Sequence, residues 1–156
     1  MNRYFAYYKS KIGFLELVSS DNSIIACNFV EKKNNYENKI TILKETIEQL
    51  DDYFNGRRME FDLDISLIGT EFQRKIWNEL LKIPYGKSIT YKELAIRIGN
   101  EKATRAVGNA NGKNPLSIII PCHRVIGSNG LLVGYGGGLE RKKWLLEFEN
   151  KISHQL

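Results

Sequence analysis

The chain has 156 residues, of which 42% are hydrophobic and 26% are charged, and its formal net charge is +5. These proportions exclude a disordered or fibrous chain, and a chain of this size buries roughly 70% of its unfolded surface. No apolar run approaches the ~20 residues that cross a bilayer, and the first residues lack the apolar stretch of a signal peptide. We therefore expect a soluble, cytoplasmic protein that does not bind membranes.

The first 68 residues have the pattern of a small α/β domain without a chemical motif. Three segments rich in β-branched and aromatic residues predict strands, at residues 3–8, 14–18 and 24–30. An amphipathic helix is expected over residues 39–54, where apolar residues recur at helical spacing. Apolar and acidic residues then alternate over residues 60–65, which predicts a half-buried strand.

Beyond residue 69 the chain is predicted to be mostly helical. A Thr-x-x-Gln box at residue 70 and a Thr-x-x-Glu box at residue 90 predict two helix starts. The first helix would bury an apolar face made of Phe72, Ile76 and Leu80. The second would continue to Ile98, and after a Gly-Asn turn a further helix is expected over residues 101–110.

The two helices within residues 91–110 form a helix-turn-helix pattern, because a short turn containing glycine joins them. The second helix consists almost entirely of small residues, and Arg105 is the one long cation among them. Small side chains let a backbone approach a partner closely. A tight contact between helices, with Arg105 in solvent, is the alternative interpretation.

The excess of basic over acidic residues lies wholly in the second part of the chain. Residues 70–156 contain 14 Lys and Arg against 7 Asp and Glu, whereas residues 1–69 contain 9 against 11. A basic module beside a mildly acidic one suggests that nucleic acid binds the basic module. A solvated basic surface without a partner is the alternative.

Cys122 is followed directly by His123. Residues 117–120 predict a short buried strand that ends at Pro121, immediately before Cys122. A free thiol has a pKa near ~8.5 and attacks as the thiolate, so it needs a base such as histidine. Adjacent side chains of an extended chain point apart, so a bridging water is simpler than direct contact, and His123 would need an orienting acid. A packed, unreactive cysteine is the alternative.

The second cysteine, Cys27, lies in an apolar stretch and is expected to be a buried hydrophobic residue. We expect neither a disulfide nor a metal site, because the two cysteines and two histidines lack metal-ligand spacing.

A series of motifs over residues 69–149 strongly resembles the O6-alkylguanine-DNA alkyltransferases, also called methylated-DNA–protein-cysteine methyltransferases. The Pro-Cys-His-Arg-Val motif at residues 121–125 is highly specific in this setting. The other matching segments are residues 69–73, 83–86, 105–108, 114–115, 135–139 and 144–146. The first 68 residues resemble the variable N-terminal domain of this family in outline only.

With this resemblance, the predicted elements define an α+β fold. A small N-terminal α/β domain, residues 1–68, would precede a mostly helical domain, residues 69–152, that contains the helix-turn-helix. Residues 153–156 would form a tail.

The resemblance implies that Cys122 takes the alkyl group from O6 of guanine, and less readily from O4 of thymine, in one in-line displacement. His123 would take the thiol proton through a water, and Glu149 would orient His123. Asn114 would hold the chain around the active turn, and Tyr91 would donate a proton to the departing guanine. The thioether product resists water, so each molecule would act once and without a cofactor.

The resemblance also implies binding to the minor groove of double-stranded DNA that carries O6-alkylguanine. Arg105 would replace the flipped nucleotide in the base stack, on the small-residue helix that includes Ala106 and Gly108. The carbonyl of Val125 and the ring of Tyr135 would line the base pocket. We expect the protein to act as a monomer.

The sequence departs from parts of this family in two respects. It lacks the cysteine and histidine set that binds zinc in some members, so we expect no zinc. Gly136 stands where some members carry serine, so a serine hydrogen bond to the lesion oxygen is not implied here.

Three alternative functions stay open at this point. The first is a lesion sensor that binds alkylated bases without repair, although such relatives carry tryptophan at the acceptor position. The second is a cysteine hydrolase that turns over repeatedly on the Cys122–His123 pair. The third is a helix-turn-helix regulator with sequence-specific binding.

Overall fold

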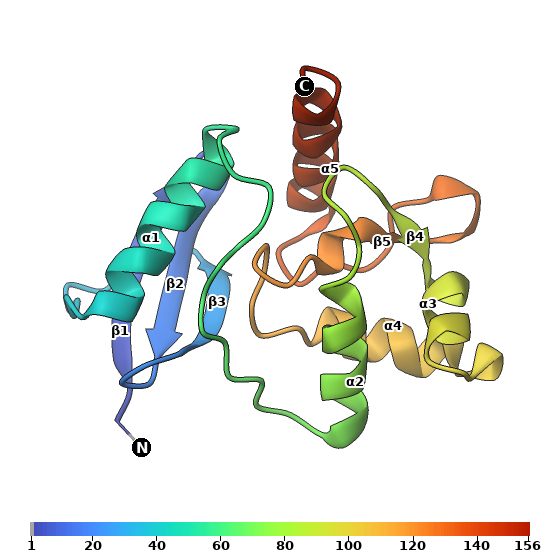
Figure 1. Ribbon diagram of the computed structural model, residues 1–156, viewed down its shortest axis with the longest axis horizontal. Coiled ribbons are helices and arrows are strands. Elements are labelled where there is room, and N and C mark those ends of the chain that lie inside the picture. Colours follow the sequence, from blue (N-terminus) through green and yellow to red (C-terminus); the bar gives the residue numbers. More distant parts are fainter. Residues whose placement is uncertain (1) are drawn as a thin grey trace. The chain divides into compact units, whose positions relative to one another are not determined.

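The computed structural model describes residues 2–156. The chain divides into two compact units, one ending at Ile68 and the other beginning at Gly69 (Figure 1). Among the described residues, no helix has both the length and the apolar character needed to cross a membrane.

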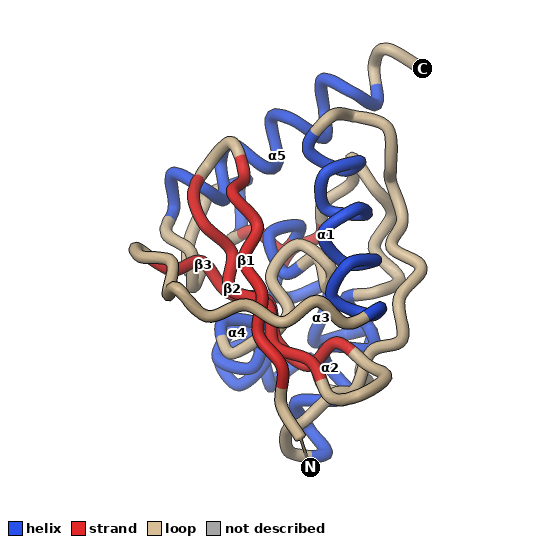
Figure 2. Tube along the Cα trace, turned by 90° about the vertical axis from the view of Figure 1, so that its left-hand side faces the viewer, coloured by secondary structure: helices blue, strands red, loops and turns tan. Residues whose placement is uncertain are grey.

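The first unit consists of a three-stranded antiparallel sheet and one helix. The strands are β1 (Tyr4–Ser10), β2 (Gly13–Ser19) and β3 (Ile24–Val30), hydrogen-bonded in that order. Figure 2 shows helix α1 (Thr41–Phe54) running alongside these strands, against which it packs. Alternate strand residues such as Leu15 and Leu17 point into the core, and Leu43 and Leu50 meet them from the helix. The three predicted strands and the helix are thus present.

The predicted strand at residues 60–65 was wrong, because only an isolated bridge between Ile24 and Ile65 forms there. The side chain of Gln49 occupies the backbone amide and carbonyl of Asp62, which a neighbouring strand would otherwise bind. Its Nε2 donates to the carbonyl of Asp62 at 2.9 Å, and its Oε1 accepts from the Asp62 amide at 2.8 Å. The alternating burial of this segment therefore reflects an extended chain without a ladder.

The second unit is mostly helical. Its elements are α2 (Glu71–Leu80), β4 (Ile89–Thr90), α3 (Tyr91–Arg97), α4 (Thr104–Gly112), β5 (Val125–Ile126) and α5 (Leu139–Ser153). Both predicted capping boxes are confirmed, with Thr70 and Thr90 accepting from the amides of Gln73 and Glu93. A 3-10 turn precedes α4, so this helix begins at Thr104 instead of residue 101, and it ends at Gly112, two residues later than predicted. Helices α2, α3 and α4 contact one another, and α3 with α4 forms the expected helix-turn-helix.

One predicted core residue of α2 lies at the surface. Ile76 and Leu80 are fully buried, but the side chain of Phe72 is 36% exposed. Trp77 takes its place in the core, and its indole Nε1 donates to the carbonyl of Ala110 at 2.9 Å. Trp77 thereby ties α2 to the end of α4, the helix that leads into the cysteine segment.

The predicted buried strand at residues 117–120 is also wrong: the segment is buried, but it forms a turn. The side chain of Asn114 holds this turn, accepting from the amide of Leu116 at 3.0 Å and donating to the carbonyl of Ile120 at 2.8 Å. Ile118 has a φ of 73°, which a β-branched residue adopts only under constraint. Side-chain hydrogen bonds from Asn114 therefore outweigh the strand preference of three successive isoleucines.

Candidate functional site

Cys122 begins a buried 3-10 turn (Cys122–Arg124) rather than the extended chain that its sequence suggested. The Cys122 amide donates to the carbonyl of Ile120 at 2.8 Å, and the Cys122 carbonyl accepts from Asn111 Nδ2 at 3.2 Å. Burial raises the pKa of the Cys122 thiol to about 11, although hydrogen bonding from Asn114 and the charge of Lys142 act against this rise. The resting group is therefore a thiol, and ionisation requires a base.

His123 and Glu149 lie in contact and are both buried. His123 Nε2 and Glu149 Oε2 are 2.7 Å apart, and Arg124 binds the same carboxylate. Burial by itself would raise the pKa of Glu149, but the charges and hydrogen bonds of His123 and Arg124 hold it far below its usual range. Because the carboxylate is ionised, His123 Nε2 carries the proton and donates it.

The other imidazole nitrogen of His123 is the chemically available one. His123 Nδ1 is buried and has no hydrogen-bond partner among the described residues. With the proton on Nε2, Nδ1 holds a lone pair and can act as a base. The site can therefore accept one proton at a defined atom, in a turn that also carries Cys122.

Tyr91 lies at the start of α3 and faces the glycine-rich loop, which comprises residues 134–138. Its hydroxyl donates to the carbonyl of Val133 at 2.8 Å. Lys142 Nζ, from α5, donates to the carbonyls of Val133 and Gly134 at 2.8 and 3.2 Å and lies 3.4 Å from the Tyr91 hydroxyl. Burial raises the pKa of Tyr91, so its phenol is protonated and can donate.

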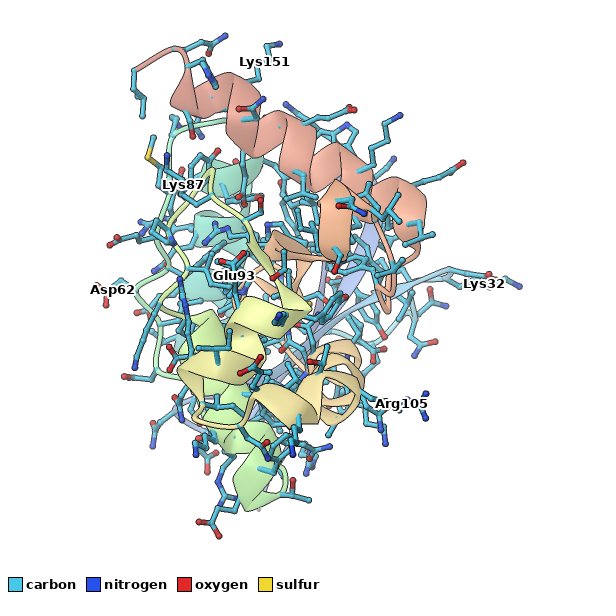
Figure 3. The ribbon with its side chains drawn as sticks, turned by 90° about the vertical axis from the view of Figure 1, so that its right-hand side faces the viewer. Lys32, Asp62, Lys87, Glu93, Arg105 and Lys151 are labelled. Carbon is cyan, nitrogen blue, oxygen red and sulfur yellow. The ribbon has the colours of Figure 1, made fainter. Side chains whose placement is uncertain are left out.

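The residues predicted to contact DNA through the small-residue helix lie on α4. Figure 3 shows the side chain of Arg105 extending away from α4. Ala106 is exposed beside it, and Gly108 packs towards Tyr91, whose ring a Cβ at that position would meet at 3.6 Å. A shallow concavity next to Arg105 is lined by Lys102, Ala103, Ala106 and Asn109.

The two predicted pocket residues differ in exposure. Val125 is fully buried in β5, where it pairs with Ile89 of β4. Tyr135 is half-buried in the loop before α5. The structure thus brings Cys122, His123, Glu149 and Asn114 together at one turn, and it places Tyr91 at the loop that carries Tyr135.

Sequence reasoning missed two charged residues of this site, Lys142 and Arg124. Both are almost completely buried. Lys142, Leu145 and Glu149 follow one another at intervals of three and four, so they share the buried face of α5. This spacing is the signal that could have revealed Lys142. Arg124 lies inside the Pro-Cys-His-Arg-Val motif, but its partner Glu149 is 25 residues away in the sequence, so no local pattern indicates their contact.

The described residues form no metal site, and the second cysteine is a buried residue of the sheet unit. Within residues 2–156, no cluster of three His, Cys, Asp or Glu side chains could hold a metal ion. Both cysteines are free thiols, and burial raises the pKa of Cys27. Cys27 lies in the core of the sheet unit, as expected for a hydrophobic packing residue.

The buried ammonium of Lys142 should give the protein a stability that depends on pH. Burial lowers the pKa of Lys142 to about 8 from an ordinary 10.5. Between these values the unfolded chain binds the proton that the folded chain has released, so the free energy of unfolding rises with pH in this window. In Lys142→Met, urea unfolding followed by tryptophan fluorescence should show a smaller rise across the window. Equal slopes for the two proteins would contradict this assignment.

The comparisons with known proteins cover both units. A family model for the 6-O-methylguanine DNA methyltransferase DNA-binding domain matches residues 71–151, and one for the ribonuclease-like domain of these proteins matches residues 3–67. A methylated-DNA–protein-cysteine methyltransferase of Methanosarcina acetivorans is 44% identical over 152 residues, covering 94% of this chain and 97% of that protein.

Solved structures give the same result. The crystal structure of the Mycobacterium tuberculosis O6-methylguanine methyltransferase matches with a TM-score of 0.88 and 41% identity, covering 96% of this chain and 94% of that one. The Mycobacterium tuberculosis OGT structure in complex with DNA matches with a TM-score of 0.88 and 42% identity, covering 95% and 93%.

An α+β fold with a helix-turn-helix next to a buried cysteine turn, matched over at least 94% of the chain, defines a DNA-binding methyltransferase of the DNA-repair class. The chain belongs to the 6-O-methylguanine DNA methyltransferase family, whose curated members are methylated-DNA–protein-cysteine methyltransferases. The predicted family, fold class and enzyme class are thereby confirmed.

Proposed function

We propose that this protein repairs DNA by moving an alkyl group, typically methyl, from O6 of guanine to Sγ of its own Cys122. O4 of thymine would be a second, poorer substrate. The observation that carries this proposal is the turn that places Cys122 next to His123, whose Nε2 binds the ionised carboxylate of Glu149 at 2.7 Å. This arrangement supplies a nucleophile and a base with a fixed tautomer.

The proton path follows from the tautomer. Because Nε2 donates to Glu149, Nδ1 is the atom that accepts the thiol proton, and a water between Sγ and Nδ1 is the proposed carrier. Buried polar atoms are normally satisfied, so the unpartnered Nδ1 supports a bridging water. Thiolate formation leaves His123 as an imidazolium whose charge Glu149 balances.

The transfer itself is one displacement. The Cys122 thiolate forms the Sγ–C bond while the C–O6 bond breaks, and the bonding pair leaves with the guanine. The departing guanine then needs one proton, and Tyr91 is the proposed donor. Solvent then returns the proton held by His123 to the Tyr91 phenolate, so the proton lost by the thiol balances the one gained by guanine. No cofactor takes part in this step, because the lesion supplies the alkyl group.

The product explains why each molecule would act once. A thioether has no carbonyl for water to attack, and covalent catalysis continues only when the nucleophile is released. Because Cys122 is only 4% exposed, an external nucleophile would also have poor access to the alkylated sulfur. We therefore expect consumption of the protein in a one-to-one ratio with repaired lesions.

A guanine inside a duplex cannot reach a buried thiol, so the damaged nucleotide must flip out. Helix α4 suits the minor groove because its exposed face is small apart from Arg105, which would fill the vacated place in the stack. Ala106 and Gly108 would allow the close approach of the backbone. Lysines and arginines of the second unit would contact phosphates without sequence preference.

The flipped base would bind between the cysteine turn and the glycine-rich loop. The carbonyl of Val125 and the ring of Tyr135 are the proposed pocket groups, and Asn114 is the residue proposed to hold the turn.

We expect the protein to act as a monomer on double-stranded DNA, in the cytoplasm, and without zinc.

One experiment tests this function against its alternatives. The protein is incubated with duplex DNA that contains a single O6-methylguanine, and the modified peptide is mapped by mass spectrometry. We expect one methyl group on Cys122, none on Cys27, and a yield that saturates at one per protein. Many turnovers would instead indicate a hydrolase. Tight binding without modification would indicate a lesion sensor, and binding that depends on sequence but not on the lesion would indicate a regulator.

A further inference from the structure

The carboxylate of Glu149 binds more than the histidine that the proposed mechanism requires. Arg124 grips it with two nitrogens: Nε lies 2.8 Å from Oε1, and Nη2 lies 3.0 Å from Oε2. The backbone amide of Gly86 also donates to Oε1, at 3.3 Å. Both charged side chains are almost fully buried, so this ion pair is shielded from water.

Arg124 is itself held in place from other directions. Its Nη1 donates to the carbonyl of Ile83 at 2.7 Å, and its guanidinium lies 5.6 Å from the centre of the Tyr85 ring. These contacts attach it to the segment between α2 and β4, while Glu149 lies on α5. Arg124 therefore fixes the orientation of the carboxylate relative to the turn that carries His123.

The donors around Glu149 account for its accepting capacity. A carboxylate offers about four lone-pair positions. Oε1 receives Arg124 Nε and the Gly86 amide, and Oε2 receives His123 Nε2 and Arg124 Nη2. A proton that arrived on either oxygen would have to displace one of these donors. The cost would be a broken, buried, charge-assisted hydrogen bond.

We propose that Arg124 is a positioning residue that holds both oxygens of Glu149, so that the proton released by Cys122 stops on His123 and never reaches Glu149. This inference rests on the proposed function and deepens it. Glu149 then serves as a permanent anion that fixes the imidazole tautomer. His123 holds the thiol proton from the formation of the thiolate until guanine has departed.

The test is a double-mutant cycle on the rate of methyl transfer. Single-turnover rate constants are measured on O6-methylguanine duplex DNA for Arg124→Gln, Glu149→Gln and the variant with both changes. We expect each single change to slow transfer by about 10²-fold, which lies in the range that general-base catalysis contributes. The double variant should be no more than about threefold slower than Glu149→Gln, because Arg124 acts only through Glu149. Losses that multiply in the double variant would overturn the proposal.

A second measurement reads the histidine directly and needs no DNA. Imidazole ¹⁵N chemical shifts of His123 should show a protonated Nε2 and a bare Nδ1 in the wild type. They should show a mixture of tautomers in Arg124→Gln. The Nε2-protonated tautomer should be partly restored in Arg124→Lys, which keeps the charge but cannot bind the carboxylate through two nitrogens. An unchanged tautomer in Arg124→Gln would overturn the proposal.

Controls separate this inference from the function on which it rests. Arg57→Gln removes an exposed arginine that pairs with Asp52 in the sheet unit, and it should change neither the rate nor the imidazole spectrum. The double variant removes both buried charges together, so it avoids the unpaired charge that could unfold a single variant. If the wild type fails to methylate Cys122, the proposed function is wrong. The spectra would still decide whether Arg124 sets the tautomer.

Discussion

Cys122→Ser should transfer no detectable methyl group while still binding DNA. A serine hydroxyl ionises far less readily than a thiol, and the buried turn raises the pKa even of the thiol to about 11. The His123 base that suffices for sulfur would therefore not suffice for oxygen. Mass spectrometry after incubation with O6-methylguanine DNA gives the yield. We expect it to fall by at least about 10³-fold, since the loss is that of the nucleophile itself.

The matched control for this experiment is Cys27→Ser. Cys27 is buried in the sheet unit and is not part of the proposed chemistry. This variant should keep full methyl transfer in its folded fraction, although a serine in an apolar core costs stability. DNA binding by Cys122→Ser should persist, because the lysines and arginines of the second unit, which are proposed to contact phosphates, are unchanged. Methylation of Cys122→Ser at any residue would contradict the assignment of the acceptor.

Arg105→Ala should impair repair of duplex DNA much more than reaction with a free base. If Arg105 fills the place of the flipped nucleotide, its removal raises the cost of base flipping, which amounts to a few kcal/mol. We expect about a 10²-fold slower transfer from O6-methylguanine in a duplex, because 2.7 kcal/mol corresponds to that factor. Reaction with free O6-benzylguanine involves no flipping and should change by less than about threefold. The two rates are measured by single-turnover methyl and benzyl transfer.

The comparison variant is Lys102→Ala, which removes a cation from the same concavity beside Arg105. A lysine that contacts phosphate contributes affinity that falls with salt, so this variant should weaken binding of damaged and undamaged duplexes alike. Arg105→Ala should instead affect the transfer step at saturating DNA. Equal losses on duplex DNA and on free O6-benzylguanine would show that Arg105 does not act in flipping.

Local patterns were sufficient for most of the secondary structure. The capping boxes at Thr70 and Thr90 were predictable because each involves hydrogen bonds that close within three residues. The antiparallel strands were predictable because a short turn between Ser10 and Gly13 sets their pairing. The two strand errors occurred where one side chain took over hydrogen bonds of the backbone. Gln49 replaced a strand partner at Asp62, and Asn114 bent the isoleucine segment into a turn.

The sequence by itself determined the family, because the Pro-Cys-His-Arg-Val motif lies in one continuous segment. The change from strand to helix patterns near residue 69 indicated the two-part fold, and the motif pointed to Cys122 and His123 as the proposed reacting pair. The resemblance implied Glu149, but the sequence did not reveal Arg124 and Lys142 as buried charges of this site. Arg124 and Glu149 lie 25 residues apart, and Lys142 reaches the carbonyl of Val133 from a helix. Only the tertiary structure brings such groups together in a buried, weakly screened environment, where their charges hold Glu149 ionised and fix the proton of His123.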